Sequence, residues 1–210
     1  MSESDPLLAG VADYYTGKFS THGRTSRGVD WNSPESQELR FEQLARLFPP
    51  PTGAGARLSV NEVGCGFGSF CGWLEKEGWK LDYHGCDISP AMVEAARESH
   101  GDRFTVGTAC PEEADFTVAS GIFNVKLGAT TEEWEGHIFR TIHRMEEMSR
   151  RGFAFNCLTS YSDAEYMRDD LYYADPCRFF DYCKRTFSRN VALLHDYDLY
   201  EFTMLVRKES

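Results

Sequence analysis

The chain has 210 residues, of which 41% are hydrophobic, and this suffices for one well-packed core and is marginal for two. Its 33 acidic and 22 basic residues give a formal net charge of −11, and no cluster of Lys and Arg forms a local basic stripe. Such an acidic surface repels phosphate backbones, which argues against a nucleic-acid partner.

The first 56 residues are predicted to form a helical N-terminal extension. Their pattern indicates a short helix over 5–18, a polar loop over 20–32 and a second helix after Ser33. Ser33 is a favourable N-cap because Pro34 follows it at the first helical position. Prolines at 49–51 end that helix, and the run to residue 56 is expected to be a linker. We therefore separate an extension or lid, 1–56, from a main domain, 57–210.

The main domain alternates predicted strands and helices. Alternation of this kind indicates an α/β fold in which helices cover both faces of a doubly wound, mostly parallel sheet. The last two strands are too close together for a helical crossover, so they must form an antiparallel hairpin. Strands are expected over 58–63, 81–86, 103–106, 116–119, 152–158, 191–195 and 200–207, and helices over 69–76, 90–100, 176–187 and from 130 or 131 to 150.

The strongest chemical signal lies between the first strand and the helix that follows it. Residues 62–68 read Glu-Val-Gly-Cys-Gly-Phe-Gly, and glycines at alternate positions let the backbone turn sharply and approach a ligand closely. The N-terminus of the next helix adds a favourable dipole. Asp87 ends the next predicted strand, where a carboxylate can accept both hydroxyls of a ribose. Together these features predict a binding site for a ribose-containing ligand.

Other interpretations of this motif remain open on the residues alone. One is a structural turn without a ligand. Another is a dinucleotide site, but that fingerprint is G-x-G-x-x-G, and here the third glycine comes one residue early. Glu62 is also awkward beside a pyrophosphate, whereas it suits the ammonium group of an amino-acid moiety, directly or through water.

Residues 57–119 resemble the cofactor half of the Rossmann-like (class I) S-adenosylmethionine-dependent methyltransferases. The E-x-G-x-G-x-G loop matches the first motif of that family, and Asp87 matches its ribose-binding acid. The resemblance implies a seven-stranded sheet with an antiparallel last strand, S-adenosylmethionine as cofactor and S-adenosylhomocysteine as product. It also implies that the cofactor is bound by the loop and by residues after the next three strands, namely Glu62, Gly64, Cys65, Gly66, Gly68, Asp87, Ile88, Met92, Thr108, Ser120 and Gly121.

The sequence departs from the family pattern at the adenine. Many members place an Asp after the third strand to bind the adenine amino group, and here that stretch reads Val-Gly-Thr-Ala-Cys over 106–110. We expect Thr108 or a backbone carbonyl to accept that hydrogen bond, while Ile88 and Met92 form an apolar wall against the ring.

The resemblance also indicates where the methyl acceptor lies. Asn124, after the fourth strand, is expected to orient the acceptor or else to cap a helix or stabilise a loop, and Asn156, at the end of the fifth strand, to contact substrate or to make structural hydrogen bonds. His195, at the predicted hairpin, is a candidate general base by residue type. The acceptor pocket of this family lies near the last helices, where we expect Tyr161, Tyr172 and Tyr173 to line it or to pack in the core.

The N-terminal extension is rich in aromatic and polar residues, and in many small-molecule methyltransferases such a segment folds over the cofactor as a lid. We expect Tyr15 to contact the cofactor. Arg40 is expected either to pair with the methionine carboxylate through two parallel hydrogen bonds or to lie on the surface of an amphipathic helix.

Targeting, membrane and metal-binding signals are not predicted. No apolar run approaches the roughly 20 residues that span a bilayer, and the acidic N-terminus lacks the pattern of a secretory signal. The seven cysteines include no C-x-x-C, so we expect neither a disulfide framework nor a metal site, but reduced thiols in the cytoplasm.

The predicted function is transfer of a methyl group from S-adenosylmethionine to oxygen, nitrogen or carbon of a small molecule by in-line displacement. Two alternatives are kept, namely a non-catalytic S-adenosylmethionine-binding regulatory module and an NAD-linked oxidoreductase. A protein or RNA methyltransferase is disfavoured by the acidic charge and by the lack of an accessory domain.

Overall fold

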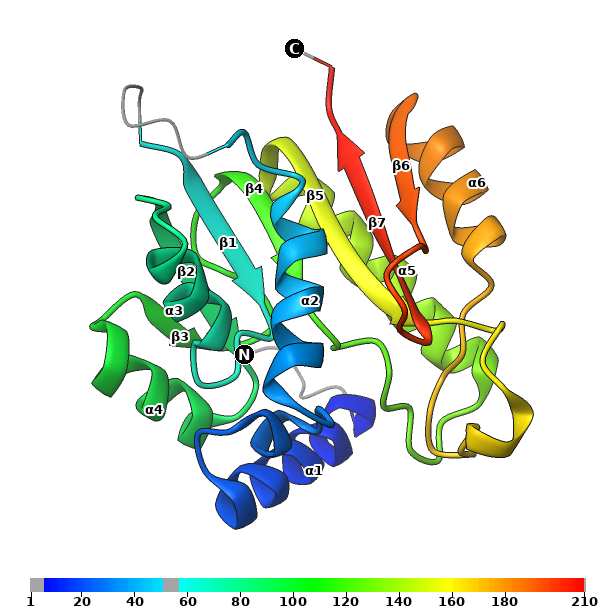
Figure 1. Ribbon diagram of the computed structural model, residues 1–210, viewed down its shortest axis with the longest axis horizontal. Helices are drawn as coiled ribbons and strands as arrows, with labels where there is room; N and C mark the ends of the chain where they lie inside the picture. Colours follow the sequence, from blue (N-terminus) through cyan, green and yellow to red (C-terminus); the bar gives the residue numbers. More distant parts are fainter. Residues whose placement is uncertain (1–5, 51–56, 210) are drawn as a thin grey trace.

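A single mixed sheet forms the centre of the structure, a computed structural model that describes residues 6–50 and 57–209 (Figure 1). Its seven strands lie in the order β3-β2-β1-β4-β5-β7-β6. Strands β1 to β5 run parallel, and β7 is antiparallel to both of its neighbours, so the predicted sheet with its C-terminal hairpin is confirmed. The strands are β1 (Ser59–Val63), β2 (Asp82–Asp87), β3 (Phe104–Val106), β4 (Ala114–Ala119), β5 (Ser149–Leu158), β6 (Asn190–Leu194) and β7 (Glu201–Arg207).

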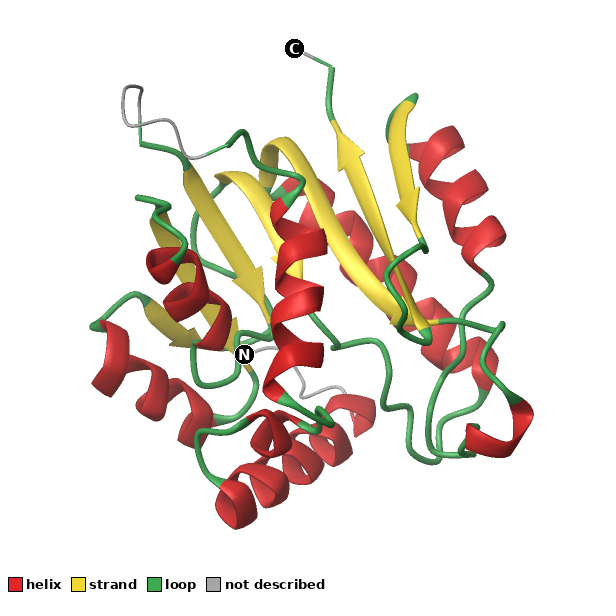
Figure 2. Ribbon diagram, viewed as in Figure 1, coloured by secondary structure: helices red, strands yellow, loops and turns green. Residues whose placement is uncertain are grey.

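Helices cover both faces of this sheet, as Figure 2 shows. On one face, Phe41 of α2 and Phe70 of α3 belong to a buried cluster with Val60 of β1. On the other face, Trp134 of α5 and Phe179 of α6 belong to a second cluster. Within the described ranges, every helix is too short or too polar to cross a bilayer. The helices are α1 (Pro6–His22), α2 (Pro34–Ala45), α3 (Ser69–Lys76), α4 (Pro90–His100), α5 (Thr131–Glu147) and α6 (Pro176–Thr186).

The burial of β5 on both faces explains why its sequence could be recognised as a strand. Phe153 and Phe155 belong to the cluster under α5 and α6, and Ala154 between them belongs to the cluster under α2 and α3. All three are fully buried. A strand that is buried on both faces needs an apolar residue at each position, and this gives a continuous apolar run rather than an alternating one.

The N-terminal segment differs from its prediction. The first helix was expected to end at residue 18, but α1 continues to His22, and the hydroxyls of Ser20 and Thr21 each donate to a backbone carbonyl one turn earlier. Gly23, with φ of +62°, follows the helix end. A short 3-10 helix, η1 (Ser26–Val29), lies within the region predicted as loop. In Figure 1, α1 lies across the carboxyl ends of the parallel strands.

Helix α2 begins as predicted. The Ser33 hydroxyl accepts a hydrogen bond from the Ser36 amide at 3.1 Å, and the Ser36 hydroxyl accepts one from the Ser33 amide at 3.3 Å. This capping box satisfies two amides that the helix itself leaves unpaired. Leu44 is fully buried against the sheet. The predicted linker includes residues 51–56, which lie outside the described residues, and the division between 56 and 57 stays a prediction.

The helix predicted to run to residue 150 is shorter than expected. Helix α5 ends at Glu147, and β5 begins two residues later at Ser149. Ser149 pairs with Ala114 of β4, and the Lys208 amide donates to the Arg151 carbonyl at 2.8 Å. Backbone pairing with neighbouring strands therefore overrides the helical propensity of the Arg-rich segment.

The connection from β3 to β4 is short. Residues 107–113 join the two strands without a helix. Parallel strands are usually joined by a helical crossover, which covers the sheet beside them. Here Thr141 and Arg144 of α5 border this connection instead. This loop and the side of α5 therefore meet beside β1 and β4, in the middle of the sheet.

Candidate functional site

A cavity of about 430 Å³ lies at the carboxyl ends of β1, β2 and β4. Its wall includes Glu62 and Phe70 from the α3 side of the sheet and Thr141 from α5 on the opposite side, so it passes around the strand ends. The volume falls within the range of small-molecule sites. Most of the predicted cofactor-binding residues line it, namely Tyr15, Glu62, Gly64, Cys65, Gly66, Asp87, Ile88, Met92, Thr108, Ser120 and Gly121.

The glycine loop forms the floor of this cavity. Gly64 and Gly66 both have positive φ values, +74° and +54°, which only glycine adopts without strain. A Cβ atom on Gly64 would overlap the side chain of Ile122, and one on Gly66 would lie 3.2 Å from Val29. Gly68, with φ of +85°, caps α3 and does not line the cavity. Its predicted role in binding the cofactor is therefore replaced by a role in starting the helix.

Asp87 connects β2 to the glycine loop. One carboxylate oxygen accepts a hydrogen bond from the Gly66 amide at 2.9 Å, and the other accepts one from the Ser89 amide at 2.8 Å. Burial raises the pKa of Asp87, whereas these amide donors act in the opposite direction. Each oxygen has a second lone pair, so the carboxylate can accept further hydrogen bonds from a ligand in the cavity.

Glu62 is the second acid of the cavity and is almost fully buried. The Tyr83 hydroxyl donates to its carboxylate. Burial raises the pKa of Glu62 to about 8, with a smaller contribution from the nearby Asp87, while the Tyr83 hydrogen bond acts to lower it. Without a cationic ligand, Glu62 is therefore protonated near neutral pH. A ligand ammonium group would favour its ionised form.

The raised pKa predicts a specific dependence of stability on pH. Between about pH 5 and pH 8 the unfolded chain has lost the Glu62 proton while the folded protein retains it, so the unfolding free energy should fall by roughly 1.4 kcal/mol per pH unit from this residue. Above that range both states are ionised and the dependence levels off. Urea unfolding over this pH range should show a flatter profile for Glu62→Gln than for the parent. Parallel profiles would show that the pKa of Glu62 is not raised.

Helix α1 and the segment after it form the roof of the cavity. Leu8, Val11 and Tyr15 of α1 line it, together with Trp31. The Thr16 and Ser89 hydroxyls lie 2.8 Å apart, which joins α1 to the start of α4. The predicted contribution of the N-terminal segment to the site thus has a geometric basis, and the apolar α1 side chains were missed because no local motif marks them.

Arg40 does not line the cavity, and its geometry does not suit the predicted carboxylate contact. Its Nε and Nη2 atoms donate to the two carboxylate oxygens of Glu201 at 2.8 and 2.7 Å, and its Nη1 atom donates to the Ser36 carbonyl. Its guanidinium also lies 3.9 Å from the ring centroid of Trp31. Arg40 therefore holds Trp31 and β7 rather than a ligand. Because it is buried, the alternative prediction of a surface position is wrong as well.

Trp31 is held tightly at the tip of β4. A Cβ atom on Gly121 would overlap the Trp31 ring, and Gly121 has φ of +75°. The ring thus packs on bare backbone beside Ser120, whose buried hydroxyl has no hydrogen-bond partner among the described residues. A ligand in the cavity would satisfy that hydroxyl.

Four residues of α5 form the far wall of the cavity, and three of them, Arg140, Thr141 and Arg144, were missed as site residues. His137, Arg140, Thr141 and Arg144 recur at intervals of three or four and so share one face of the helix. This spacing was visible in the sequence, but the α5 face becomes part of the cavity only because no helix lies between β3 and β4.

The predicted acceptor residues Asn124 and Asn156 lie outside the cavity. The Asn124 side-chain oxygen accepts from the Leu158 amide at 3.1 Å, and the Asn156 oxygen accepts from the Gly121 amide at 2.7 Å. Of the two roles considered for each, the structure therefore supports the structural one. Asn156 fixes the backbone at the tip of β4, where the cavity is lined by Gly121.

The remaining predicted acceptor residues also lie away from the cavity wall. His195 and Tyr161 are exposed and their ring centroids are 5.9 Å apart. The Tyr172 hydroxyl donates to Glu135 at 2.8 Å, and the Tyr173 hydroxyl accepts from a backbone amide. These residues pack the loops beyond β5, and a base or acceptor wall formed by them has no geometric support.

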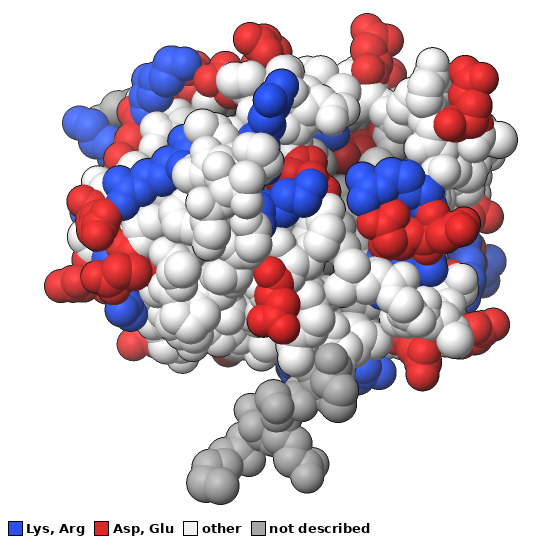
Figure 3. Space-filling view, turned by 90° about the horizontal axis from the view of Figure 1, so that it is seen from below, with Lys and Arg blue, Asp and Glu red and all other residues white. Residues whose placement is uncertain are grey.

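The face that carries α1 is shown in Figure 3. Basic and acidic side chains alternate around its rim, with wide uncharged areas between them. This distribution agrees with the acidic net charge and with the absence of a basic stripe in the sequence.

Comparisons with known proteins point in the same direction. The family model described as a methyltransferase domain matches residues 60–152. A curated protein of Mycobacterium tuberculosis (strain ATCC 25618 / H37Rv), which carries the name "Putative methyltransferase Rv1506c", is 56% identical over 157 residues. The match covers 73% of this chain and 95% of that protein.

Solved structures share the fold. Magnesium protoporphyrin IX methyltransferase from Synechocystis PCC 6803, with bound S-adenosylmethionine, has a TM-score of 0.64 at 16% identity and covers all of both chains. The N-methyltransferase NodS from Bradyrhizobium japonicum WM9, with S-adenosylhomocysteine, has a TM-score of 0.64 at 16% identity over 95% of this chain and 98% of that one. The fold is that of the Rossmann-like methyltransferases. With the family match and the mycobacterial relative, the chain belongs to the class I S-adenosylmethionine-dependent methyltransferases.

Proposed function

We propose that the protein transfers the methyl group of S-adenosylmethionine to a small molecule that enters the cavity under α1. The observation that carries this proposal is the pair of buried acids, Glu62 and Asp87, on the wall of one cavity at the carboxyl ends of β1 and β2. Ligands of open α/β sheets bind at this edge. The two acids match two groups of the cofactor, its ammonium group and its ribose hydroxyls.

The residues present fit this cofactor. Asp87 keeps free acceptor capacity after its two amide hydrogen bonds, and the buried Ser120 hydroxyl lacks a partner among the described residues. Gly64 and Gly121 line the cavity with backbone rather than with side chains. Thr108 lines the cavity where the family pattern has an adenine-binding Asp, and we assign it to the nucleobase.

A small acceptor is favoured by the walls of the site. Apolar side chains of α1 roof the cavity, and Trp31 closes it at the tip of β4, so a bulky macromolecular substrate would have to displace both. The two solved relatives described above are named for methylating magnesium protoporphyrin IX and for N-methylation. The acidic net charge also disfavours an RNA acceptor.

In-line displacement needs alignment more than acid–base chemistry. The bound cofactor supplies an electrophilic methyl group on a sulfonium. Glu62 and Asp87 hold the ammonium group and the ribose on either side of the sulfonium, and the α1 roof excludes water. Neither of the side chains predicted as catalytic, Asn124 and His195, lines the cavity, whereas His137 of α5 does, so the proposal relies on positioning of the acceptor and assigns no base.

Two measurements test the proposal, namely binding of the cofactor and transfer of its methyl group. Calorimetric titration should show binding of S-adenosylmethionine and S-adenosylhomocysteine but not of NAD, and methyl-labelled cofactor should transfer its label to a component of small-metabolite extracts. Binding of NAD alone would favour the oxidoreductase alternative. Cofactor binding without transfer to any extract would favour the non-catalytic regulatory module.

A further inference from the structure

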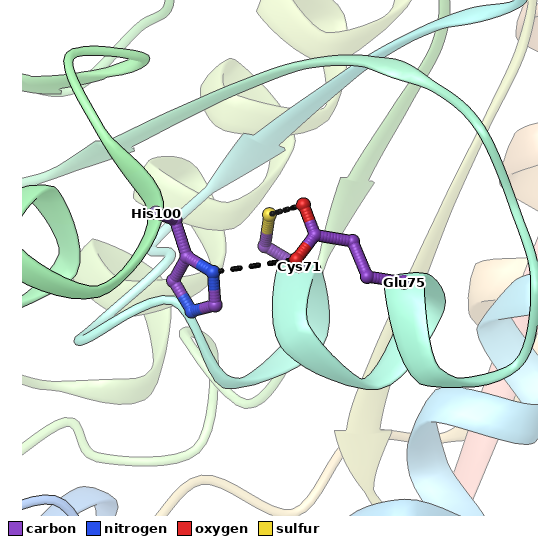
Figure 4. A group of neighbouring side chains, drawn as sticks. All are labelled: Cys71, Glu75 and His100. Carbon is purple, nitrogen blue, oxygen red and sulfur yellow. Dashed lines mark hydrogen bonds and ion pairs between the residues drawn. The ribbon is translucent and has the colours of Figure 1, made fainter.

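Three side chains that can ligate a metal meet where α3 faces the end of α4, and none of them lines the cavity (Figure 4). Cys71 and Glu75 come from α3, one helical turn apart, and His100 is the last residue of α4. Figure 4 shows the Glu75 carboxylate between the thiol and the imidazole. One ligand atom from each of the three lies within 4.8 Å of the others.

The separations are close to those of a tetrahedral site. Glu75 Oε1 lies 3.9 Å from Cys71 Sγ, and Glu75 Oε2 lies 3.6 Å from His100 Nδ1. With zinc bonds of about 2.0–2.3 Å, tetrahedral ligand atoms stand roughly 3.3–3.7 Å apart. The Cys71 and His100 ligand atoms lie within 4.8 Å of each other. A shift of at most about 1 Å would therefore bring the three ligands to tetrahedral separations.

The His100 imidazole packs against two glycines, Gly68 before α3 and Gly72 within it. A Cβ atom on Gly68 would lie 2.9 Å from His100 Cδ2, and one on Gly72 would lie 3.1 Å from His100 Cε1. A side chain at either position would crowd the ring and force it to shift. The arrangement therefore depends on the backbone of this segment and is more than a chance meeting of surface side chains.

Arg103 supports the carboxylate from outside. Its Nη2 atom lies 2.6 Å from Glu75 Oε1, which leaves Oε2 facing the imidazole. Metal-ligating carboxylates are commonly held by such an outer hydrogen bond. Cys71 is buried, whereas the Glu75 side chain is about half exposed, so an ion has an entry path from solvent.

We propose that Cys71, Glu75 and His100 bind one zinc ion, with water as the fourth ligand, and that the ion joins α3 to α4. The thiolate, imidazole and carboxylate are the ligand types that zinc takes in proteins. Binding breaks the S–H bond of Cys71 and forms a Zn–S bond, and the proton passes to solvent. Burial raises the pKa of the free thiol to about 12, so this proton is present before the ion binds. The site is independent of the methyl-transfer proposal.

Sequence patterns did not predict this site, because its ligands lie on two helices and no C-x-x-C is present. Only the packing of α4 against the start of α3 brings them together. The expectation of no metal site rested on spacing within the chain, and spacing cannot detect ligands that come from separate helices.

The test uses the full chain, stripped of metal and kept reduced. Zinc titrated against a chromophoric chelator should bind at one equivalent, and cobalt in its place should give a thiolate-to-cobalt charge-transfer band. Cys71→Ser and His100→Gln should each weaken zinc binding at least about tenfold, and Cys71→Ser should abolish the band. Cys177→Ser, which removes the exposed cysteine of α6, is the matched control and should change neither.

Two results would overturn the site. One is zinc binding that is absent, or that is unaffected by His100→Gln, a change at a partly exposed helix end that leaves the core intact. The other is a cobalt complex of the parent without the charge-transfer band, because that excludes a thiolate ligand. Circular dichroism and thermal unfolding of each variant without metal establish that the fold is retained.

Discussion

Asparagine in place of Asp87 should weaken the binding of S-adenosylmethionine by at least about a hundredfold. The substitution removes the negative charge of the carboxylate to which two ribose hydroxyls would donate. Each such charge-assisted hydrogen bond contributes about 1.5–3 kcal/mol. The amide oxygen can still accept one of the two backbone hydrogen bonds, from Gly66 or Ser89, so the loop should keep most of its shape. Calorimetric titration with S-adenosylmethionine and S-adenosylhomocysteine measures the effect.

Asp82→Asn is the control for that experiment. Asp82 begins the same strand but is exposed and does not line the cavity. The Asp82→Asn substitution removes one negative charge, as Asp87→Asn does. It therefore distinguishes loss of the ribose contact from a general effect of net charge on cofactor binding. Cofactor affinity that drops equally in both variants, or in neither, would contradict the assignment of Asp87 to the ribose.

Removing the Arg40 side chain should destabilise the fold by about 3–5 kcal/mol. Arg40 and Glu201 form a bidentate ion pair in which the Glu201 side chain is fully buried and that of Arg40 is 9% exposed. Arg40→Met leaves a buried carboxylate without its counter-ion, and Glu201→Leu leaves the guanidinium unpaired. Urea unfolding at neutral pH should show a large loss of stability for each single variant.

The double variant distinguishes a lost ion pair from lost packing. With Arg40→Met and Glu201→Leu combined, no uncompensated charge remains, and most of the lost stability should return. Lys76→Ala, which breaks the exposed pair with Glu38, should cost at most about 1 kcal/mol. Strictly additive losses in the double variant would show that the two charges do not act as a pair.

Most of the sheet was predictable because its strands are buried on both faces and because glycine and proline mark the helix ends. The helices over 69–76 and 90–100 have the predicted bounds, and the final antiparallel pairing followed from a connection too short for a crossover. The predicted bounds of the elements are wrong where pairing with a distant strand determines the backbone conformation. Residues 149–151 are drawn into β5 by pairing with β4 and with the Lys208 amide, and this long-range contact has no local signature.

The cofactor side of the site was predictable for a similar reason. Glycines at 64 and 66 and the acid at 87 are fixed by backbone geometry within one β-α-β unit. The rest of the cavity wall was not, because it depends on how α1, Trp31 and α5 come together in space. Arg40 illustrates the difference. Its partner Glu201 is 161 residues further along the chain, so sequence spacing could not identify the pair. The cytoplasmic location stays a prediction.

The order of the strands has a consequence for folding during synthesis. Strand β7 lies between β5 and β6, although both of these precede it in the chain. Until β7 leaves the ribosome, one edge of β5 is unpaired and β6 has no neighbouring strand. Arg40 also lacks its ion-pair partner, because Glu201 is 161 residues further along the chain. At typical translation rates this delay is on the order of ten seconds. Nascent chains stalled before residue 201 should therefore be open to edge-to-edge association and in need of chaperone protection.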